Sequence, residues 1–253
     1  MLLETRGLLK RFGGVTAVNE VDLAIDERQA FGLIGPNGAG KTTLINVISG
    51  QLRADAGSVR LTGRDVTNLP PHRLTALGIA RTFQGVRLFK GLTVLDNALV
   101  GRHSRMRSDV LASLVPRRTR AESMDVARVR GLLERVGLAA HEAKLAGELS
   151  YGDQRRLEIA RALAAEPVLL ILDEPAAGMN PTESARLRTL MRDLVEGGLT
   201  IVLIEHDVRL VMGTCERVAV LNFGRKIAEG TPADVQRDAA VREAYLGTER
   251  EIA

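Results

Sequence analysis

The stretch Gly35-Pro36-Asn37-Gly38-Ala39-Gly40-Lys41-Thr42-Thr43 decides the fold. It follows an apolar run at 31–34 and opens a helical pattern at 44–48, the context in which Gly-x-x-x-x-Gly-Lys-Thr forms a phosphate-binding loop. Glycines let successive N–H groups point at phosphate oxygens, and the following helix turns its positive end toward them. Residues 37–43 are therefore predicted to bind a nucleoside triphosphate, with Lys41 on the β and γ phosphates and Thr42 on Mg²⁺.

A second apolar run, 168–172, ends in the adjacent carboxylates Asp173 and Glu174. Sheets of alternating strands and helices bind ligands at the carboxyl ends of their strands. Asp173 is therefore expected to hold Mg²⁺, commonly through water, and Glu174 to polarise the water that attacks the phosphate. Each pattern has a plain alternative, a glycine-rich turn without a ligand and a strand that ends in solvated acids. Their occurrence together favours a nucleotide site.

Apolar runs rich in Val and Ile alternate with helical patterns along the rest of the chain, which predicts an α/β fold. The clearest strands are expected at 31–34, 168–172, 200–204 and 218–222, and shorter ones at 2–8, 21–25 and 58–61. The fold class is thus a phosphate-loop NTPase core with a small antiparallel β patch and an inserted helical subdomain. The core is assigned to 1–88 and 166–253, and the helical subdomain, with helices at 124–136 and 151–165, to 89–165.

Composition excludes several classes of protein. The 253 residues are 45% hydrophobic and 26% charged, values that argue against a disordered chain. Only 3% are aromatic and none is Trp, so no base-stacking nucleic-acid surface and no nucleic-acid partner are expected. Cys215 is the single cysteine, which excludes an internal disulfide and fits a reducing compartment. The apolar runs are far shorter than the roughly 18 residues that span a bilayer.

The positive charge is confined to one segment. Residues 101–120 hold six arginines and one aspartate in a chain whose net charge is only +4. A mobile, solvated loop is the favoured interpretation, because Ser and Pro interrupt the segment. The alternative is contact with an anionic membrane surface, to which each arginine would contribute about 1 kcal/mol.

The stretch Leu149-Ser150-Tyr151-Gly152-Asp153-Gln154 narrows the class. It resembles the Leu-Ser-Gly-Gly-Gln signature of ATP-binding cassette (ABC) ATPases, and the order of motifs along nearly the whole chain is similar to that family. Ser150 reads as a helix N-cap with Asp153 completing a capping box, so this helix also presents free N–H groups to an anion. The resemblance implies that residues 150–153 contact the γ-phosphate of ATP held by another subunit. A well-capped surface helix is the alternative.

The resemblance also implies roles for four residues outside these motifs. Phe12 is expected to stack on adenine, with Val18 packed beside it; a core Phe is the alternative. Gln84, in Arg81-Thr82-Phe83-Gln84, matches the glutamine that touches Mg²⁺ and water and reports nucleotide binding to the permease contact. His206 matches the switch histidine that contacts the γ-phosphate; read alone, it is an ordinary loop residue.

The sequence departs from the general family at three positions. Tyr151 stands where the family has Gly, although Tyr is familiar in one subgroup, and Asp153 replaces the usual Gln. The acid either slows hydrolysis or only caps the helix. Asn180 stands where many relatives have Asp, yet it remains a sound N-cap, with Pro181 in the first turn and Glu183 completing a capping box.

The stretch 78–97, the Tyr-containing signature, the run 175–183 and the ending Ala244-Tyr245-Leu246-Gly247 resemble the ATPase subunit of branched-chain and hydrophobic amino-acid importers. This implies an ATPase on the cytoplasmic face of the inner membrane, bound to integral permease subunits and served by an extracytoplasmic solute-binding protein. A heterodimer with a paralogous ATPase is expected, and a homodimer for the chain alone. The alternatives are a lipid or lipopolysaccharide exporter subunit, a soluble ABC protein of DNA repair or translation, and a metabolic kinase.

Overall fold

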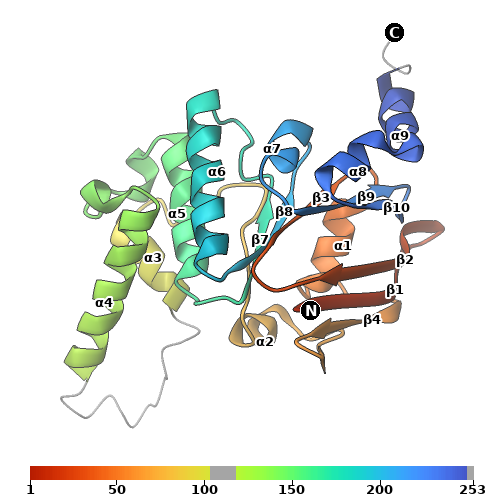
Figure 1. Ribbon diagram of the computed structural model, residues 1–253. Coiled ribbons are helices and arrows are strands. Elements are labelled where there is room, and N and C mark those ends of the chain that lie inside the picture. The colour runs from red at the N-terminus through yellow and green to blue at the C-terminus, as the bar shows by residue number, and fades with distance from the viewer. Residues whose placement is uncertain (103–117, 250–253) are drawn as a thin grey trace.

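The computed structural model describes residues 1–102 and 118–249, and these form the predicted α/β architecture (Figure 1). The strands are β1 (Leu3–Phe12), β2 (Val15–Ile25), β3 (Ala30–Ile34), β4 (Ala56–Leu61), β5 (Arg64–Asp65), β6 (Ile79–Arg81), β7 (Leu169–Asp173), β8 (Thr200–Ile204), β9 (Arg217–Asn222) and β10 (Arg225–Gly230). The helices are α1 (Lys41–Ile48), α2 (Pro71–Ala76), α3 (Val94–Gly101), α4 (Arg118–Arg135), α5 (Tyr151–Leu163), α6 (Pro181–Glu196), α7 (Val208–Met212), α8 (Pro232–Arg237) and α9 (Ala239–Glu249), with short 3-10 helices η3 (Ala139–His141) and η4 (Ala146–Glu148).

The larger sheet has the strand order β10-β9-β3-β8-β7-β6, and every pair in it is parallel except β9 with β10. Its central strands are buried on both faces, as their continuous apolar sequences predicted. In β7, Leu169 and Ile171 face a core shared with α1, while Leu170 and Leu172 face the core beneath α5 and α6. This alternation fixes the register of β7, because a one-residue slip would exchange the two faces.

The smaller sheet, β2-β1-β4-β5, is antiparallel, as expected for the N-terminal region. Helix α1 lies between the two sheets (Figure 1), and its buried Leu44, Ile45 and Ile48 share one core with residues of both. Because α1 begins at Lys41, this packing fixes the start of the helix relative to the large sheet.

Helices α3, α4 and α5 pack against one another on the far side of the molecule from β1 and β2 (Figure 1). Among the described residues of the range 89–165, the backbone pairing between Thr93 and Leu145 is the only β-type contact, and it is an isolated bridge. The helix expected at 151–165 is α5, and the one expected at 124–136 is α4, which begins earlier, at Arg118.

Arg102 corrects the interpretation of the basic segment. Its side chain is buried rather than solvated, with Nη2 2.7 Å from Asp125 Oδ1 and Nη1 2.6 Å from Glu166 Oε1. A charge this deeply buried requires such partners. Arg118 and Arg120 also depart from the expected loop, because they lie in helix α4. Residues 103–117 lie outside the described residues, so the expectation for Arg105, Arg107 and Arg117 stays a prediction.

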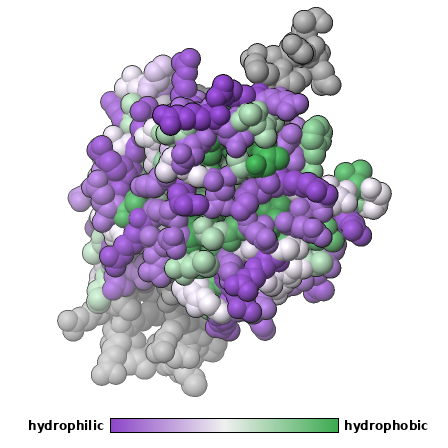
Figure 2. Space-filling model, turned by 45° about the vertical axis from the view of Figure 1, so that its right-hand side comes forward, coloured by the Kyte–Doolittle hydropathy of each residue, from purple (hydrophilic) through white to green (hydrophobic). Residues whose placement is uncertain are grey.

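The surface in Figure 2 is mainly hydrophilic, with hydrophobic residues in separate small patches. Through residues 1–102 and 118–249, no helix combines the length and apolar character needed to cross a membrane. Exposed aromatic side chains include Phe12, Phe89 and Phe223.

Candidate functional site

Four parallel strands deliver the predicted site residues to one edge of the large sheet. The phosphate loop follows β3, Gln84 follows β6, Glu174 follows β7, and His206 follows β8. These strands are neighbours in the order β3-β8-β7-β6, so their carboxyl ends lie together. Parallel sheets bind ligands at this edge. Site residues from distant parts of the sequence come together here, and each follows its strand within a few residues.

The Lys41 side chain makes hydrogen bonds to the backbone of its own phosphate loop. Its Nζ donates to the carbonyl oxygens of Gly35 at 2.6 Å and Pro36 at 3.0 Å, so the loop wraps around its own cation. Burial lowers the pKa of Lys41 below its usual range, and the negative charges of Glu174 and Asp173 oppose that change. The lysine therefore lies within electrostatic reach of both predicted carboxylates. Thr42, in the first turn of α1, is exposed.

At Gly40 the phosphate loop leaves no room for a side chain. Its φ of 99° lies in the left-handed region, and a Cβ there would overlap the carbonyl oxygen of Ala17. Gly38 has a φ of 77°, but a Cβ at that position would have nothing within 4 Å. Gly40→Ala and Gly38→Ala carry similar backbone strain, about 1–3 kcal/mol, and only the first adds a clash. We expect Gly40→Ala to lower the free energy of unfolding in urea by at least about 1 kcal/mol more than Gly38→Ala; equal losses would contradict the clash.

Asp173, the predicted Mg²⁺ carboxylate, is buried and ion-paired. Its Oδ2 lies 2.7 Å from Arg81 Nη2, and both side chains are less than a tenth exposed. Arg81 also donates to Asn46 Oδ1 on α1 at 2.7 Å and to Ser49 Oγ, directly after α1, at 2.9 Å. One arginine therefore holds the end of β7 against the helix of the phosphate loop, a residue that motif reading did not identify.

The structure brings the three predicted catalytic side chains together. Gln84 Nε2 donates to Glu174 Oε2 at 2.9 Å, and His206 Nδ1 lies 3.9 Å from Glu174 Oε1. Glu174 has a φ of 48°, a left-handed conformation that is unusual for a non-glycine residue, and its N–H donates to Ile204 O at 2.9 Å. Strained backbone is typical of positions that aim a functional side chain.

Glu205 lies behind this group and is 1% exposed. Its Oε1 accepts the N–H of Ala176 at 2.9 Å, in the segment that follows Glu174. Burial raises the pKa of Glu205, while hydrogen bonds from Ala176 and the charge of His206 oppose the rise and the charge of Glu174 adds to it. The folded protein therefore binds the proton of this carboxyl group more strongly than the unfolded chain does.

This shift predicts a pH-dependent stability. Because the folded pKa exceeds the unfolded one, the contribution of Glu205 is most favourable below the unfolded pKa and declines as pH rises through the folded pKa. Glu205→Gln imitates the protonated form and keeps an acceptor oxygen. We expect it to raise the Tm at pH 7 by about 2–4 °C, roughly 1 kcal/mol, and to have no stabilising effect at pH 4. The exposed Glu134→Gln is the control; a lower Tm for Glu205→Gln at pH 7 would contradict the predicted effect.

The start of α5 lies beside the start of α6. Ser150 caps α5 by accepting the N–H of Asp153 at 3.2 Å, as predicted, but the reciprocal half of the capping box is absent because Asp153 pairs with Arg156. A Cβ on Gly152 would lie 2.6 Å from Glu183 Oε1. The capping box predicted for α6 is complete between Asn180 and Glu183.

These segments surround a small hollow of about 190 Å³. Ser150, Gly152 and Asp153 line it, together with Met179 and Glu183. Tyr151, the first residue of α5, is half-exposed. No residue of the phosphate loop lines this hollow.

The two residues expected at adenine differ in exposure. Phe12 is 47% exposed at the end of β1, with Lys10 Nζ 5.4 Å from its ring centroid, so it is not a core residue. Val18 is 0% exposed and packs in the core between the sheets. Val18 was expected to pack beside Phe12 at the nucleotide, but its side chain presents no surface to a ligand, so its role in this structure is core packing.

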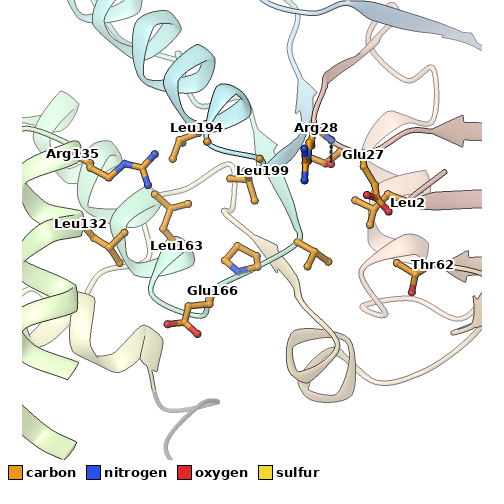
Figure 3. A pocket seen from close by; sticks show the side chains of 15 residues that line it. Leu2, Glu27, Arg28, Thr62, Leu132, Arg135, Leu163, Glu166, Leu194 and Leu199 are labelled. Atoms are coloured by element: carbon orange, nitrogen blue, oxygen red, sulfur yellow. Dashed lines mark hydrogen bonds between the residues drawn. The ribbon is translucent and has the colours of Figure 1, made fainter. Parts of the chain in front are cut away.

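A pocket lies at the opposite edge of the sheet (Figure 3), and its volume is about 460 Å³. Val168 and Thr200, at the amino ends of β7 and β8, line it, with Arg28 and Arg135 on either side. Both arginines are exposed. None of the predicted site residues lies in this pocket.

Comparison with known families agrees with the geometry. Residues 18–177 match the family model described as "ABC transporter". The chain belongs to the ABC transporter family of ATP-binding cassettes. Residues 225–251 of this ABC chain also match a model described as "Branched-chain amino acid ATP-binding cassette transporter".

Curated relatives of this ABC chain align over almost its full length. The high-affinity branched-chain amino acid transport ATP-binding protein LivG of Salmonella typhimurium is 45% identical, covering 97% of this chain and 98% of its own. BraF of Pseudomonas aeruginosa, which has the same description, is 44% identical with the same coverage. The ADP conformation of MJ1267, an ATP-binding cassette of an ABC transporter, has a TM-score of 0.86 at 34% identity, over 97% of this chain and 98% of that one.

Proposed function

We propose that the chain is the ATP-hydrolysing subunit of an ABC importer that takes up branched-chain or other hydrophobic amino acids. The observation that carries this proposal is the convergence of Lys41, Gln84, Glu174 and His206 at one sheet edge. The named relatives and the match at 225–251 support the amino-acid class. Export of lipid or lipopolysaccharide, a soluble ABC role and a metabolic kinase lack such support.

The chemistry follows from the positions of these side chains. The loop N–H groups at 37–43 and Lys41 bind the triphosphate, and Phe12 stacks on the base. Glu174 orients a water and accepts its proton as the water oxygen bonds to the γ-phosphorus; the bond from that phosphorus to the bridging oxygen breaks, giving ADP and phosphate. Gln84 holds one oxygen of the Glu174 carboxylate by a hydrogen bond, and His206 lies 3.9 Å from the other oxygen. Preorganisation of this kind lowers the barrier because no side chain must reorient in the transition state.

Mg²⁺ suits the donors present. The Thr42 hydroxyl, the Asp173 carboxylate and the Gln84 amide oxygen are hard oxygen ligands of the kind that Mg²⁺ prefers, and Mg²⁺ usually keeps several waters. Bound there, the ion would neutralise charge on the β and γ phosphates. The Arg81 contact leaves Asp173 fixed in place but shared between a cation of the protein and the proposed metal.

The signature residues Ser150, Tyr151, Gly152 and Asp153 are proposed to bind ATP held by a second subunit. Each nucleotide would then lie between the α1 start of one chain and the α5 start of the other, an arrangement with closed twofold symmetry. We propose a paralogous ATPase as the natural partner and a homodimer for the isolated chain. The helical part, 89–165, would contact integral permease subunits at the cytoplasmic face of the cell membrane, with an extracytoplasmic solute-binding protein delivering the amino acid.

Mixing two inactive variants tests this assembly. Lys41→Ala removes the phosphate cation and Ser150→Ala removes the signature cap, so each homodimer lacks both composite sites. A mixed pair keeps one intact site. We expect the mixture to recover up to about one quarter of the wild-type ATPase rate, since random pairing makes half of the assemblies mixed and each has one working site. No recovery, with mixed pairs confirmed by two affinity tags, would contradict shared sites.

A further inference from the structure

Arg155 is a buried arginine that the predicted mechanism does not use. It lies one turn into α5, and its side chain is 3% exposed. The guanidinium donates to the carbonyl oxygen of Phe83 at 2.9 Å and to that of Gln84. It also donates to the Tyr151 hydroxyl, from Nε at 3.1 Å and from Nη2 at 2.8 Å. Glu158 Oε2 lies 3.4 Å from Nη1 and supplies a compensating charge.

These acceptors belong to two different functional segments. Phe83 and Gln84 are in the loop after β6, where the Gln84 side chain contacts Glu174. Tyr151 opens α5 at the signature surface. A single guanidinium therefore bridges the two segments. Because it is planar and holds several acceptors in fixed directions, it transmits a displacement better than a flexible ammonium does.

The next turn of α5 strengthens the same connection. Glu158 Oε1 accepts the N–H of Arg87 at 2.7 Å, and Arg161 donates to the carbonyl oxygen of Arg87. The loop 83–87 is therefore bound to α5 mainly through its backbone, while its Gln84 side chain remains directed to Glu174. A movement of that loop must either pull α5 or break several hydrogen bonds, three of which are partly buried. A polar group left unpaired away from water is costly.

We propose that Arg155 is a positioning residue that couples Gln84 to the start of α5, so that nucleotide bound at Lys41 changes the placement of Tyr151 in the same chain. This inference rests on the proposed function, because it takes the phosphate loop and the signature surface as two nucleotide contacts. The coupling is intramolecular and does not require a second subunit.

Amide hydrogen exchange of the full chain, with and without a nonhydrolysable ATP analogue and Mg²⁺, tests the proposal at concentrations where light scattering shows a single copy. In the wild type, we expect the analogue to slow exchange at 36–43, 82–88 and 151–154. In Arg155→Gln, slowing at 36–43 should stay within about twofold of wild type, whereas slowing at 151–154 should fall about tenfold or more. Arg192→Gln, the matched loss of one exposed arginine on α6 that pairs only with Asp193 and Glu196 among the described residues, should preserve the wild-type pattern.

The outcomes separate the two claims. Absence of slowing at 36–43 in the wild type would contradict the proposed function itself. Slowing at 36–43 without any at 151–154, or unchanged slowing at 151–154 in Arg155→Gln, would overturn the role of Arg155 alone. If Arg155→Gln fails to fold, Arg155→Lys serves instead, because it keeps a cation beside Glu158 but loses the fork that spans two carbonyls. The same loss at 151–154 is expected for it, and wild-type coupling in Arg155→Lys would overturn the proposal.

Discussion

Glu174→Gln is expected to lower the ATPase rate about a hundredfold or more while leaving ATP affinity within about threefold of wild type. The amide cannot accept the proton of the attacking water, but it has nearly the shape of the carboxylate. Glu174 is held by the backbone bond to Ile204 and by Gln84, so the substitution removes a charge without removing a support. ATP bound but not hydrolysed should accumulate in a two-subunit assembly, measured by phosphate release and light scattering.

The exposed Glu196→Gln, at the end of α6, is the matched control for loss of one carboxylate, and we expect it to hydrolyse ATP at the wild-type rate. Hydrolysis by Glu174→Gln within a factor of about three of wild type would show that another group orients the water.

Lys41→Ala is expected to weaken ATP binding by about 10- to 100-fold, because a charge-assisted hydrogen bond contributes about 1.5–3 kcal/mol. A second effect adds to the lost charge. Lys41 also makes hydrogen bonds to the Gly35 and Pro36 carbonyl oxygens. Its removal therefore leaves the conformation of the phosphate loop less restrained.

Isothermal titration with a nonhydrolysable analogue measures this loss, with the exposed Lys144→Ala as the control for removal of a surface lysine. An unchanged dissociation constant for Lys41→Ala would refute the phosphate role of residues 37–43.

The buried strands could be predicted because a continuous apolar run is typical of a strand that is buried on both faces of a sheet. β8 has the predicted bounds, and β3, β7 and β9 differ from theirs by a single residue at one or both ends. The three-residue β6 and the partly exposed edge strand β10 were missed, since neither has a continuous apolar run. β1 and β2 extend well beyond the predicted 2–8 and 21–25, because irregular register between them interrupts the alternation of polar and apolar residues.

The candidate site was predictable where a motif fixes the chemistry. Gln84, Glu174 and His206 carry such patterns, and the structure gathers them, although their roles remain proposals. Arg81 and Arg155 were missed because an arginine in a sequence indicates a surface residue. Only the fold reveals that Asp173 and the loop at Gln84 supply their partners. Val18 was misassigned for the opposite reason, since a family position does not tell whether a side chain reaches the surface.

The proposed mechanism depends on two helix starts, on separate chains, that bind one nucleotide. The structure of Glu174→Gln with ATP and Mg²⁺, determined with two copies or with the natural partner ATPase, shows whether they do. We expect a γ-phosphate held by Lys41 of one chain and within hydrogen-bonding distance of residues 150–153 of the other. A γ-phosphate that contacts only the chain of its own Lys41, with every signature segment remote from it, would refute the mechanism.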